Sequence, residues 1–458
     1  MLAQHTLKKL MFTPLRQNRF IGGTMELLLK IANRIHECGG EIFYVGGYVR
    51  DKIIGKPNKD IDVEIYNITP DNLKAVLAEF GEVQTIGKSF GIYNIKGLDI
   101  DFALPRTETA TGRGHKDFEV FVDPFIDKKT ACSRRDFTMN ALMENVITGE
   151  ILDFFGGKED INNKIIRHVS DSTFSEDPLR VLRACQFSAR FGFEIAEETK
   201  ALARKADLTA LPSERIFEEV KKALTKSKKP SIFFNALKEM GHEYLFPELY
   251  RLDGIEQSAD YHPEGNVYVH TMCVLDSLAD RGWYNLKLML SAICHDMGKY
   301  ESHVFDGNKH HFYNHESVGL PIAEAFLSRL TNETEIHKYV LDMVKNHMRI
   351  HQSLKSKKPK VWNRIFNESI APTMLIELSF ADTLNRDNFE HLKAIEWYKA
   401  YYNHCHDDAE LQGKDLIALG YTPSPKFSEI LEFAHGLWLS MTPFDQIVKS
   451  VKAEFPID

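Results

Sequence analysis

Two short stretches, Tyr44-Val45-Gly46-Gly47-Tyr48-Val49-Arg50-Asp51 and Asp60-Ile61-Asp62, determine which fold this chain adopts. The apolar run from Ile42 to Val45 predicts a strand, and Gly46 and Gly47 after it let the backbone approach a phosphate where the next helix begins. Arg50, in the first turns of that helix, is placed to bind the same anion. Because most strand-glycine-helix turns are only tight turns, this stretch gains its meaning from the aspartates that follow.

Asp60 and Asp62 lie in an alternating segment, 59–66, which predicts a strand with both carboxylates on one face. Considered alone, such a pair is usually a solvated strand face. Two neighbouring carboxylates nevertheless repel each other unless a cation neutralises them, and Mg²⁺ prefers oxygen ligands of this kind. We therefore predict that Asp60 and Asp62 hold Mg²⁺ and are catalytic residues of a two-metal nucleotidyl transfer.

A third carboxylate from a neighbouring strand would complete this metal site. The segment Gly97–Leu104 alternates in the same way and carries Asp101, which we choose as the third catalytic carboxylate. Asp99 and Glu64 are the alternatives. A Gly-Gly turn, a short helix and then an Asp-x-Asp strand is the order found in nucleotide-transferring heads of the polymerase-β type, and this part of the chain resembles such a head.

Two further blocks carry charged side chains that suit a nucleotide. Arg134 and Arg135 offer forked donors for triphosphate oxygens, although adjacent arginines are usually solvated. Asp177, followed by a proline, is typical of a helix cap. Asp177, Arg180 and Arg183 are spaced by three, so we expect them to share one side of that helix and to present donors and acceptors to a base edge.

Five motifs thus follow one another along roughly residues 41–250. They are Gly46-Gly47-Tyr48-Val49-Arg50-Asp51, Asp60-Ile61-Asp62, Ala103-Leu104-Pro105-Arg106-Thr107-Glu108, Arg134-Arg135-Asp136-Phe137-Thr138-Met139-Asn140-Ala141-Leu142 and Glu176-Asp177-Pro178-Leu179-Arg180-Val181-Leu182-Arg183. Their order resembles that of the class II tRNA nucleotidyltransferases, the CCA-adding enzymes, and of their relatives the bacterial poly(A) polymerases.

The resemblance implies template-independent addition of CCA to the 3′ end of tRNA from CTP and ATP, with Mg²⁺ in the head. Glu176 would belong to the motif that selects C or A. The residues that would bind the nucleotide are Gly46, Gly47, Arg50, Arg106, Arg135, Asp177, Arg180 and Arg183. Gln186 stands where close relatives often carry another nucleotide-contacting arginine, which leaves that triphosphate contact open. Addition of A alone or of CC alone, and a poly(A) polymerase, are the alternatives.

Histidines and aspartates recur further along the chain, in stretches of helical spacing. His270, the pair His295-Asp296 and the distant Asp382 follow the order of the HD phosphohydrolase superfamily, which this part resembles. A single buried histidine is more often a core residue, but imidazoles and carboxylates from separate helices can converge on a divalent metal. The resemblance implies that these four residues bind a divalent metal of unknown identity, and that His315 and His347 extend the site.

The activities implied for such a domain are those of a phosphatase, a 2′-nucleotidase and a 2′,3′-cyclic phosphodiesterase. Two alternatives stay open. One is a degenerate HD domain kept as a scaffold, and the other is an HD phosphohydrolase whose head only binds.

The expected architecture is α+β: a polymerase-β-type head followed by an all-helical body that includes the HD domain. Helical spacing covers 179–191, 214–224 and 232–240, and helices resume from 266 to the end, with loops at 306–313 and 353–359. The expected divisions are a loose N-terminal leader at 1–24, the head at 25–160, a helical nucleotide- and RNA-binding neck at 161–255, the HD domain at 256–400 and a helical extension at 401–458.

The net charge of −8, from 65 acidic and 57 basic residues, does not fit a protein that only coats nucleic acid. Contact with RNA phosphates then needs local basic surface, although each lysine cluster is individually more often a solvated face. We expect RNA contacts from Lys221, Lys222, Lys228, Lys358 and Lys360. Scattered cysteines without a C-x-x-C pair indicate reduced thiols and a cytoplasmic protein, and the lack of a run of about 18 apolar residues predicts no membrane span.

Overall fold

The chain divides into two compact units that are described separately here. The computed structural model describes residues 14–58, 60–86, 91–110, 118–259, 262–353, 356, 358–383 and 389–457. Unit 1 comprises Met1–Ile216 and Glu239–His242, and unit 2 comprises Phe217–Lys238 and Glu243–Asp458. The division falls inside the neck expected at 161–255, because helix α9 (Ser213–Lys226) runs through it without interruption.

A seven-stranded sheet forms the centre of the head in unit 1, with the strand order β3-β4-β5-β2-β1-β8-β9. The strands are β1 (Glu41–Val45), β2 (Ile61–Tyr66), β3 (Val83–Ile86), β4 (Ile92–Ile95), β5 (Ile100–Ala103), β8 (Met143–Asn145) and β9 (Ile151–Leu152). Only the β2–β5 pairing is parallel among these pairs, and the other neighbours are antiparallel. The mixed sheet confirms the α+β class expected for the head.

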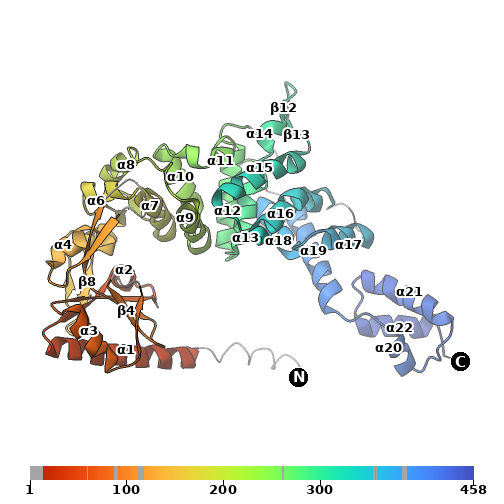
Figure 1. Ribbon diagram of the computed structural model, residues 1–458. Helices are drawn as coiled ribbons and strands as arrows, with labels where there is room; N and C mark the ends of the chain where they lie inside the picture. The colour runs from red at the N-terminus through yellow and green to blue at the C-terminus, as the bar shows by residue number, and fades with distance from the viewer. Residues whose placement is uncertain are drawn as a thin grey trace. The chain divides into compact units, whose positions relative to one another are not determined.

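Helices α1 (Pro14–Glu37), α2 (Gly47–Ile54) and α3 (Pro70–Ala78) pack against the strands of the sheet in unit 1 (Figure 1). Leu28, Ile31 and Ile35 of α1 are fully buried, since apolar residues three to four apart form one face of a helix. The expectation of a loose leader at 1–24 is wrong for residues 14–24, which form the first turns of α1. Residues 1–13 lie outside the described part.

The remainder of unit 1 connects the sheet to a helical layer. A separate hairpin is formed by β6 (Arg106–Ala110) and β7 (Phe118–Val122). The other elements are α4 (Lys128–Ser133), η1 (Thr138–Asn140), α5 (Gly157–Asn163), β10 (Ile165–Ile166), α6 (Asp171–Glu176), α7 (Leu179–Phe191), β11 (Glu194–Ile195) and α8 (Glu197–Ala203). Helix α7 has the bounds that its apolar spacing predicts and ends at Gly192, which adopts the left-handed region at φ 71.

Unit 2 is helical apart from one hairpin. Its helices are α10 (Ser231–Glu239), η2 (Glu243–Leu245), α11 (Pro247–Tyr250), α12 (Val267–Asp280), α13 (Leu286–Cys294), α14 (Lys299–Ser302), α15 (His315–Leu330), α16 (Thr334–Ser353), α17 (Pro359–Glu368), α18 (Pro372–Thr383), α19 (Phe389–Asp407), α20 (Gly413–Ala418), α21 (Lys426–Leu439) and α22 (Phe444–Glu454). Helices α12, α13, α16 and α18 pack together (Figure 1). The loop expected at 306–313 is largely a hairpin of β12 (His303–Phe305) and β13 (His310–Phe312).

Two expectations about the whole chain can be compared with this fold. All six cysteines lie in the described part and are free thiols. Among the described residues, no helix combines the length and the apolar character that a membrane crossing requires.

Candidate active sites

Three carboxylates of the head gather around strand β2. Asp60 directly precedes β2, and Asp62 lies within it. Asp101 on β5 is the parallel register partner of Asp62, so the two side chains leave the sheet on the same face. Asp99 precedes β5 and is exposed. The register thus favours Asp101 over Asp99, which the alternation alone left open, and its role as the third carboxylate stays a prediction.

The pKa of Asp62 reflects this crowding. Partial desolvation raises it, and the neighbouring carboxylates of Asp101 and Asp60 raise it further, while Arg135 lowers it. A group of carboxylates that disfavours its own ionised form is a good ligand set for a hard divalent cation.

Glu64, the other alternative for the third carboxylate, serves a different purpose. It is buried, and it accepts hydrogen bonds from Tyr66 Oη at 2.7 Å, Arg134 Nη2 at 3.1 Å and Arg135 Nη2 at 3.3 Å. Although burial opposes ionisation, these two arginines hold the pKa of Glu64 below its usual value. Glu64 lies two residues from Asp62 on β2 and so shares its strand face, but both arginines of the basic block cover it there, which argues against Glu64 as the third metal ligand.

The glycine turn lies beside this carboxylate group. Gly46 has φ 62 and ψ −125, a conformation that only glycine adopts readily, and it caps α2. A Cβ added to Gly46 would lie 3.1 Å from Arg135 Nη1. Arg135 thus connects the turn, the buried Glu64 and the open Asp62. This places a guanidinium close to the backbone N–H groups at the start of α2, where a phosphate can bind.

Arg50 lies in the interior and is only 4% exposed. Its Nε donates to Asp51 Oδ1 at 2.7 Å, its Nη1 donates to Asn140 Oδ1 at 2.6 Å, and the guanidinium lies 4.8 Å from the centroid of Phe191. In this structure Arg50 supports the turn from within, because its donors already have partners. Its contact with a nucleotide stays a prediction.

The side chains of Asp177, Arg180 and Arg183 all form hydrogen bonds within unit 1. Arg180 donates to the backbone oxygen of Arg134 at 2.8 Å and to that of Thr173, and Arg183 Nε donates to Asp136 Oδ2 at 2.7 Å. Both arginines therefore tie α7 to the basic block, as expected for one side of a helix.

Asp177 acts as expected of a cap residue, since its Oδ1 accepts a hydrogen bond from the backbone nitrogen of Leu179 at 3.1 Å. It lies before α7 in an extended conformation, and it accepts hydrogen bonds from Arg215 Nη1 at 3.3 Å and Nη2 at 3.0 Å. Glu176 ends α6 and is exposed. Gln186 is 1% exposed, and its amide nitrogen forms no hydrogen bond with the described residues.

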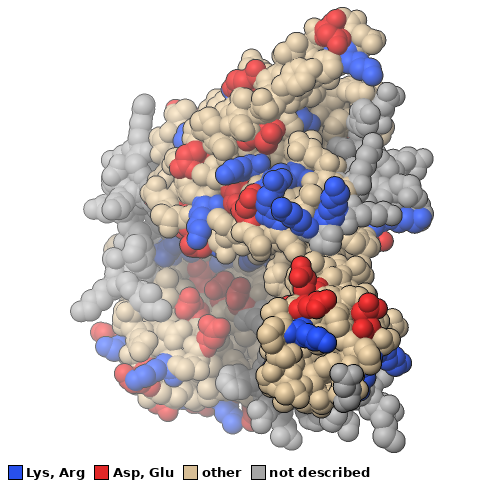
Figure 2. All heavy atoms as spheres, turned by 90° about the vertical axis from the view of Figure 1, so that its right-hand side faces the viewer, with Lys and Arg blue, Asp and Glu red and all other residues tan. Residues whose placement is uncertain are grey.

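The remaining predicted contact residues lie at the surface or near it. Arg106 begins β6, opposite Val122 of β7. Lys221 and Lys222 of α9 lie within reach of Glu218 at 3.3 Å and Glu219 at 2.7 Å, respectively. Lys228, Lys358 and Lys360 are exposed. Figure 2 shows Lys and Arg side chains gathered in one patch on the face that it presents, so an acidic protein can still offer basic surface locally. The assignment of individual lysines to RNA stays a prediction.

The histidines and aspartates of unit 2 form a second, buried cluster. Ligand atoms of His270, His295 and Asp382 lie within 4.8 Å of one another, and so do those of Asp296, His315 and His347. These six residues come from or directly adjoin α12, α13, α15, α16 and α18, and each is at most 5% exposed. The chain therefore brings together all four predicted HD residues and both residues predicted to extend the site.

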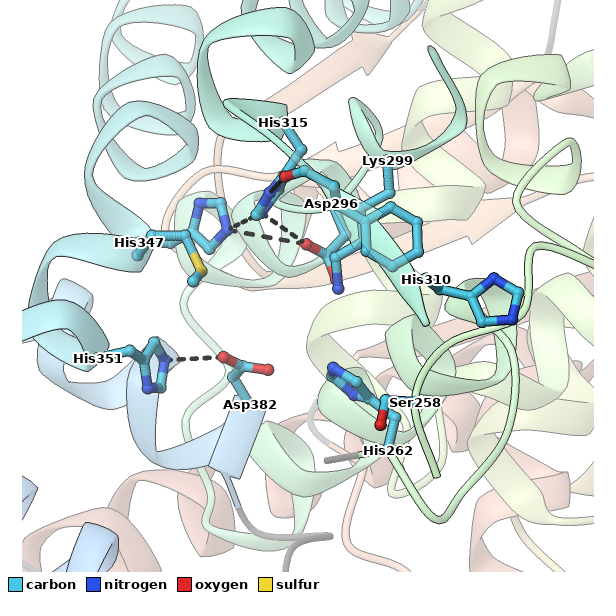
Figure 3. Close-up of a pocket in the computed structure, with 11 residues that line it drawn as sticks. Ser258, His262, Asp296, Lys299, His310, His315, His347, His351 and Asp382 are labelled. Carbon is cyan, nitrogen blue, oxygen red and sulfur yellow. Dashed lines mark hydrogen bonds and ion pairs between the residues drawn. The ribbon is translucent and has the colours of Figure 1, made fainter. Parts of the chain in front are cut away.

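Asp296 lies between the two groups. Its Oδ2 is 3.2 Å from His295 Nε2 and 3.7 Å from His270 Nε2, while its Oδ1 is 3.3 Å from His315 Nε2 and 3.7 Å from His347 Nε2. In Figure 3 the side chains of Asp296, His315 and His347 point toward one another. Burial opposes ionisation of Asp296, but His295 and Lys299 hold its pKa well below the usual range.

The histidine rings are held so that Nε2 faces the cluster. Nδ1 of His295, His315 and His347 lies 2.8, 3.0 and 2.7 Å from the backbone oxygens of Ala292, Phe312 and Val344, respectively. A backbone oxygen accepts only from a protonated Nδ1, which leaves a lone pair on Nε2 of the neutral ring. Burial and the neighbouring His315 lower the pKa of His347 well below its usual value, which favours that neutral form.

The nitrogen and oxygen atoms of this cluster are suitable ligands for a divalent metal. His270 Nε2, His295 Nε2 and Asp296 Oδ2 are buried and form no hydrogen bond of acceptable geometry with the described residues, although Asp382 Oδ1 lies 2.9 Å from His270 Nε2 and Lys299 Nζ lies 2.8 Å from Asp296 Oδ2. Buried polar atoms without such bonds are costly, and a shared cation would satisfy all three. A cavity of about 310 Å³ opens beside the cluster, lined by Asp296, His315, His347 and Asp382 among others.

Several residues around this cavity were missed by the sequence reasoning. Lys299 Nζ donates to Gln257 Oε1 at 2.7 Å and lies 2.8 Å from Asp296 Oδ2. His351 Nε2 lies 2.8 Å from Asp382 Oδ2. Glu264 lies 2.5 Å from Nδ1 of His270 and 3.1 Å from Nδ1 of His262. The spacing of His351 four residues after His347, on one helix face, was a signal that could have found it.

Comparison with known proteins places these sites in a family. The description "Poly A polymerase head domain" matches residues 42–167, and "Probable RNA and SrmB- binding site of polymerase A" matches residues 192–252. A multifunctional CCA protein of Acinetobacter baumannii (strain AYE) is 34% identical over 330 residues, covering 70% of this chain and 77% of that protein. One of Ralstonia nicotianae is 35% identical over 326 residues, covering 69% and 74%. This chain belongs to the multifunctional CCA protein family.

Solved structures agree with this family membership at the level of the fold. The Thermotoga maritima CCA-adding enzyme complexed with tRNA-CCA has a TM-score of 0.58 and 20% identity, covering 94% of this chain and 95% of that one. The Bacillus stearothermophilus CCA-adding enzyme in complex with CTP has a TM-score of 0.58 and 21% identity, covering 92% and 93%. The resemblance to CCA-adding enzymes seen in the motifs is thus confirmed, and the HD domain of this CCA-family chain stays a prediction.

Proposed function

We propose that this chain adds C, C and A to the 3′ end of tRNA, using CTP and ATP without a nucleic-acid template. The observation that carries the proposal is the register of β2 and β5, which sets Asp62 beside Asp101 with Asp60 at the start of the same strand. Membership in the multifunctional CCA protein family supports the tRNA substrate. A location in the cytoplasm remains part of the proposal.

In this mechanism Asp60, Asp62 and Asp101 would hold two Mg²⁺ ions. Mg²⁺ bound there would favour deprotonation of the RNA 3′-hydroxyl and neutralise the leaving pyrophosphate. The chain supplies the positioning: the N–H groups after Gly46 and Gly47 and the guanidinium of Arg135 bind the triphosphate.

Further contacts are proposed around this centre. Arg106 binds the nucleotide from β6. Arg180 and Arg183 read the base from α7 together with Asp177, once their present partners release them.

Incorporation of labelled nucleotide tests the proposal. Transcripts ending before, within and just short of CCA are incubated with Mg²⁺ and with CTP or ATP, singly and together. We expect C, C and then A to be added, and Asp60→Ala to lower the rate at least 1,000-fold, on the order of what loss of a principal metal ligand costs. Asp99→Ala removes the alternative third carboxylate, and it should keep the wild-type rate if Asp101 is that ligand.

The other outcomes separate the rival functions. Addition of A only to a transcript ending in CC, or of CC only, would make this an enzyme of narrower output. A long A tail on unrelated RNA would make it a poly(A) polymerase. No incorporation by the wild-type chain, with phosphate still released from phosphorylated ends, would leave a head that only binds.

We also propose that unit 2 is an HD-type, metal-dependent phosphohydrolase acting as a phosphatase, 2′-nucleotidase and 2′,3′-cyclic phosphodiesterase. The buried ligand atoms of His270, His295 and Asp296 support a metal site there. The group of His270, His295 and Asp382 and the group of Asp296, His315 and His347 lie next to each other through Asp296, which suits one or two divalent cations. A cation in this site would supply a bound water of lowered pKa as the nucleophile.

Other side chains of this cavity have proposed roles in the hydrolysis. Lys299 offers positive charge to the phosphate. His262, paired with Glu264, lines the cavity and can hold a proton for the leaving oxygen.

Phosphate release from 2′-phosphorylated and 2′,3′-cyclic substrates tests this second activity, with Mg²⁺, Mn²⁺, Ni²⁺ and Co²⁺ compared. Asp296→Asn should abolish phosphate release and metal binding while leaving CCA addition unchanged, because the head's carboxylates belong to unit 1. Bound metal is measured by elemental analysis of the purified variant. Wild-type protein that retains no metal and releases no phosphate would identify the cluster as a scaffold.

A further inference from the structure

The hairpin β12–β13 contributes directly to the cavity of unit 2. His310 and Phe312, two residues apart on β13, line the cavity together with the predicted metal ligands Asp296, His315 and His347. Their antiparallel register partners on β12 are Phe305 and His303. Directly opposed residues of a strand pair lie on one face, so these four side chains share one face of the hairpin, of which His310 and Phe312 line the cavity. We call this set of four the ring face.

The rings of this face form a continuous row. The centroids of His303 and Phe312 are 5.3 Å apart with an interplanar angle of 22°. Those of His303 and His310 are 5.0 Å apart at 9°, with a hydrogen-bond distance of 2.8 Å between Nε2 and Nδ1. Phe305 completes the row, with its centroid 4.7 Å from that of His310. The row runs from Phe312 to Phe305, and its last ring is 55% exposed.

Charge near the row complements a phosphate. Lys299 Nζ lies 2.8 Å from Asp296 Oδ2 and 5.3 Å above the ring of Phe312. A cation thus stands between the predicted metal site and the start of the ring face. A ligand that carries a phosphate next to a flat aromatic group can reach the cluster, Lys299 and the rings together. Among biological phosphoesters, nucleotides combine these two features, and bases stack on aromatic side chains with little regard to sequence.

We propose that the ring face binds the base of a nucleoside phosphate whose phosphate group is hydrolysed at the histidine–aspartate cluster. The new element is the place of the base: this site would make the proposed 2′-nucleotidase prefer terminal nucleotides, free or at the 3′ end of RNA, to phosphoesters without a base. This inference rests on the phosphohydrolase proposed for unit 2. Phe305 is the residue that sets the preference, because its ring is the open end of the row.

Steady-state hydrolysis by the full-length chain, with its divalent metal supplied, tests the preference. Guanosine 2′-monophosphate is compared with glycerol 2-phosphate, which lacks a base, and guanine is not a base that the head is proposed to add. Phe305→Ala should raise KM for the guanosine substrate about ten-fold, as expected for one lost base–ring contact, and leave kcat and the glycerol substrate unchanged. Phe305→Tyr should restore the wild-type KM.

Val304→Ala is the matched control. Val304 is the neighbour of Phe305 on β12, is 51% exposed and leaves the strand on the opposite face, so its truncation should change neither substrate's KM. An equal rise for both substrates in Phe305→Ala, or no rise for either, would overturn the proposal. An oligoribonucleotide with a terminal 2′-phosphate should show the same rise as the mononucleotide. A rise confined to the oligonucleotide would place the ring contact away from the terminal base and contradict the inference.

Calorimetric binding separates this inference from the hydrolase proposal. In chelator-treated protein, which cannot turn over, guanosine 2′-monophosphate should bind about ten-fold more tightly than glycerol 2-phosphate, and Phe305→Ala should remove that advantage. If the wild-type chain shows this binding but hydrolyses nothing with any metal, the phosphohydrolase fails and the base site stands. If hydrolysis is intact but the binding advantage is absent, the base site fails.

Discussion

Asn58 shows how a single residue can position the proposed catalytic carboxylates of the head. Its Nδ2 donates to Asp51 Oδ2 at 3.0 Å, and its Oδ1 accepts from the backbone nitrogen of Asp60 at 3.0 Å. Asp51 is buried and also forms an ion pair with Arg50. Asp60, the proposed catalytic aspartate, is therefore anchored to the interior of unit 1 through one amide side chain.

We predict that Asn58→Ala lowers the rate of nucleotide incorporation about ten-fold and raises the Mg²⁺ concentration needed for half-maximal rate, as is typical for residues that orient a metal ligand. The Arg50–Asp51 pair remains in this variant, so the fold of unit 1 should persist. Asn33→Ala, which removes an exposed amide of α1, serves as the control. A normal Mg²⁺ dependence of Asn58→Ala would show that Asp60 needs no such anchor.

Asp136 gives a pH-dependent prediction. Burial raises its pKa, but Arg183, Asn140 and the N–H of Phe137 outweigh burial and hold the pKa below 3.8. A lowered folded-state pKa means stability that is present above the unfolded value and lost as the pH falls through the folded value. Asp136→Asn should therefore cost about 2 kcal/mol at pH 7, and the difference from wild type should shrink below pH 3.8.

The measurement is urea-dependent hydrogen exchange of peptides from α7, recorded at pH 7 and again in acid. A difference between Asp136→Asn and wild type that stays constant with pH would contradict the ionised pair with Arg183.

At the scale of single residues, the sequence allowed us to predict which residues carry the chemistry, but not which residues contact one another. The alternation of 97–104 put Asp99 and Asp101 on one face, because strand periodicity fixes which residues share a face, but only the register with β2 sets Asp101 opposite Asp62. The burial of Glu64 and Arg50 could not be predicted in that way, because their partners Arg134, Arg135 and Asn140 are far along the chain. Such pairs depend on tertiary packing, which periodicity does not contain.

Helix α15 is held against the segment that carries His295 and Asp296 by a close approach at Gly298. A Cβ added to Gly298 would lie 2.0 Å from the backbone oxygen of His315 and 2.5 Å from the nitrogen of Gly319. No side chain other than hydrogen fits between these backbones. The glycine therefore sets how near His315 lies to Asp296.

We predict that Gly298→Ala destabilises unit 2 by about 3 kcal/mol, at the upper end of overpacking costs, and abolishes phosphate release. Gly436→Ala is the matched control within unit 2, since a Cβ there meets nothing within 4 Å. It should stabilise α21 by about 0.5–1 kcal/mol because alanine is the better helix former. Differential scanning calorimetry of both variants measures the effect, and similar thermograms would argue against a tight contact at Gly298.

Long helices were predictable from apolar spacing, and α7 is the best example, but the β12–β13 hairpin was not. Its strands are only three residues long and hold His303, His310 and His311, which carry no period-two pattern of apolar and polar residues. The Asp306-Gly307 pair between two short aromatic runs is a hairpin signal that was present in the sequence.

The charge distribution of the whole molecule leads to a prediction about salt. The net charge is −8, yet Lys358 and Lys360 are exposed and close together in the chain. If they contact tRNA phosphates, the double variant Lys358→Ala/Lys360→Ala should bind tRNA more weakly and lower the slope of log K against log salt concentration by about 1–2.

Titrations of tRNA binding at several salt concentrations measure that slope. Lys30→Ala/Lys96→Ala removes the same charge from exposed lysines that pair with Glu26 and Glu82, and it should leave the slope unchanged. Equal slopes for both double variants would exclude Lys358 and Lys360 from the RNA contact.

The order of the sites was predictable at this scale, but the division of the chain was not. The sequence places the nucleotidyl-transfer motifs before the histidines, and the structure keeps the two clusters in separate units. The expected boundary near 255 differs from the observed division near 216. Helix α9 crosses that division with an unbroken apolar face and no Pro- or Gly-rich linker, so composition offered no signal.

The same division decides what can be learned from intrinsic fluorescence. All four tryptophans, Trp283, Trp362, Trp397 and Trp438, belong to unit 2. Excitation at the red edge of the absorption band selects tryptophan, so the emission will report on unit 2 alone. Unfolding of unit 1 will leave the tryptophan emission unchanged. A tryptophan introduced into unit 1, for example by Tyr48→Trp beside the glycine turn, would give that half its own emission signal and allow nucleotide binding to be followed directly.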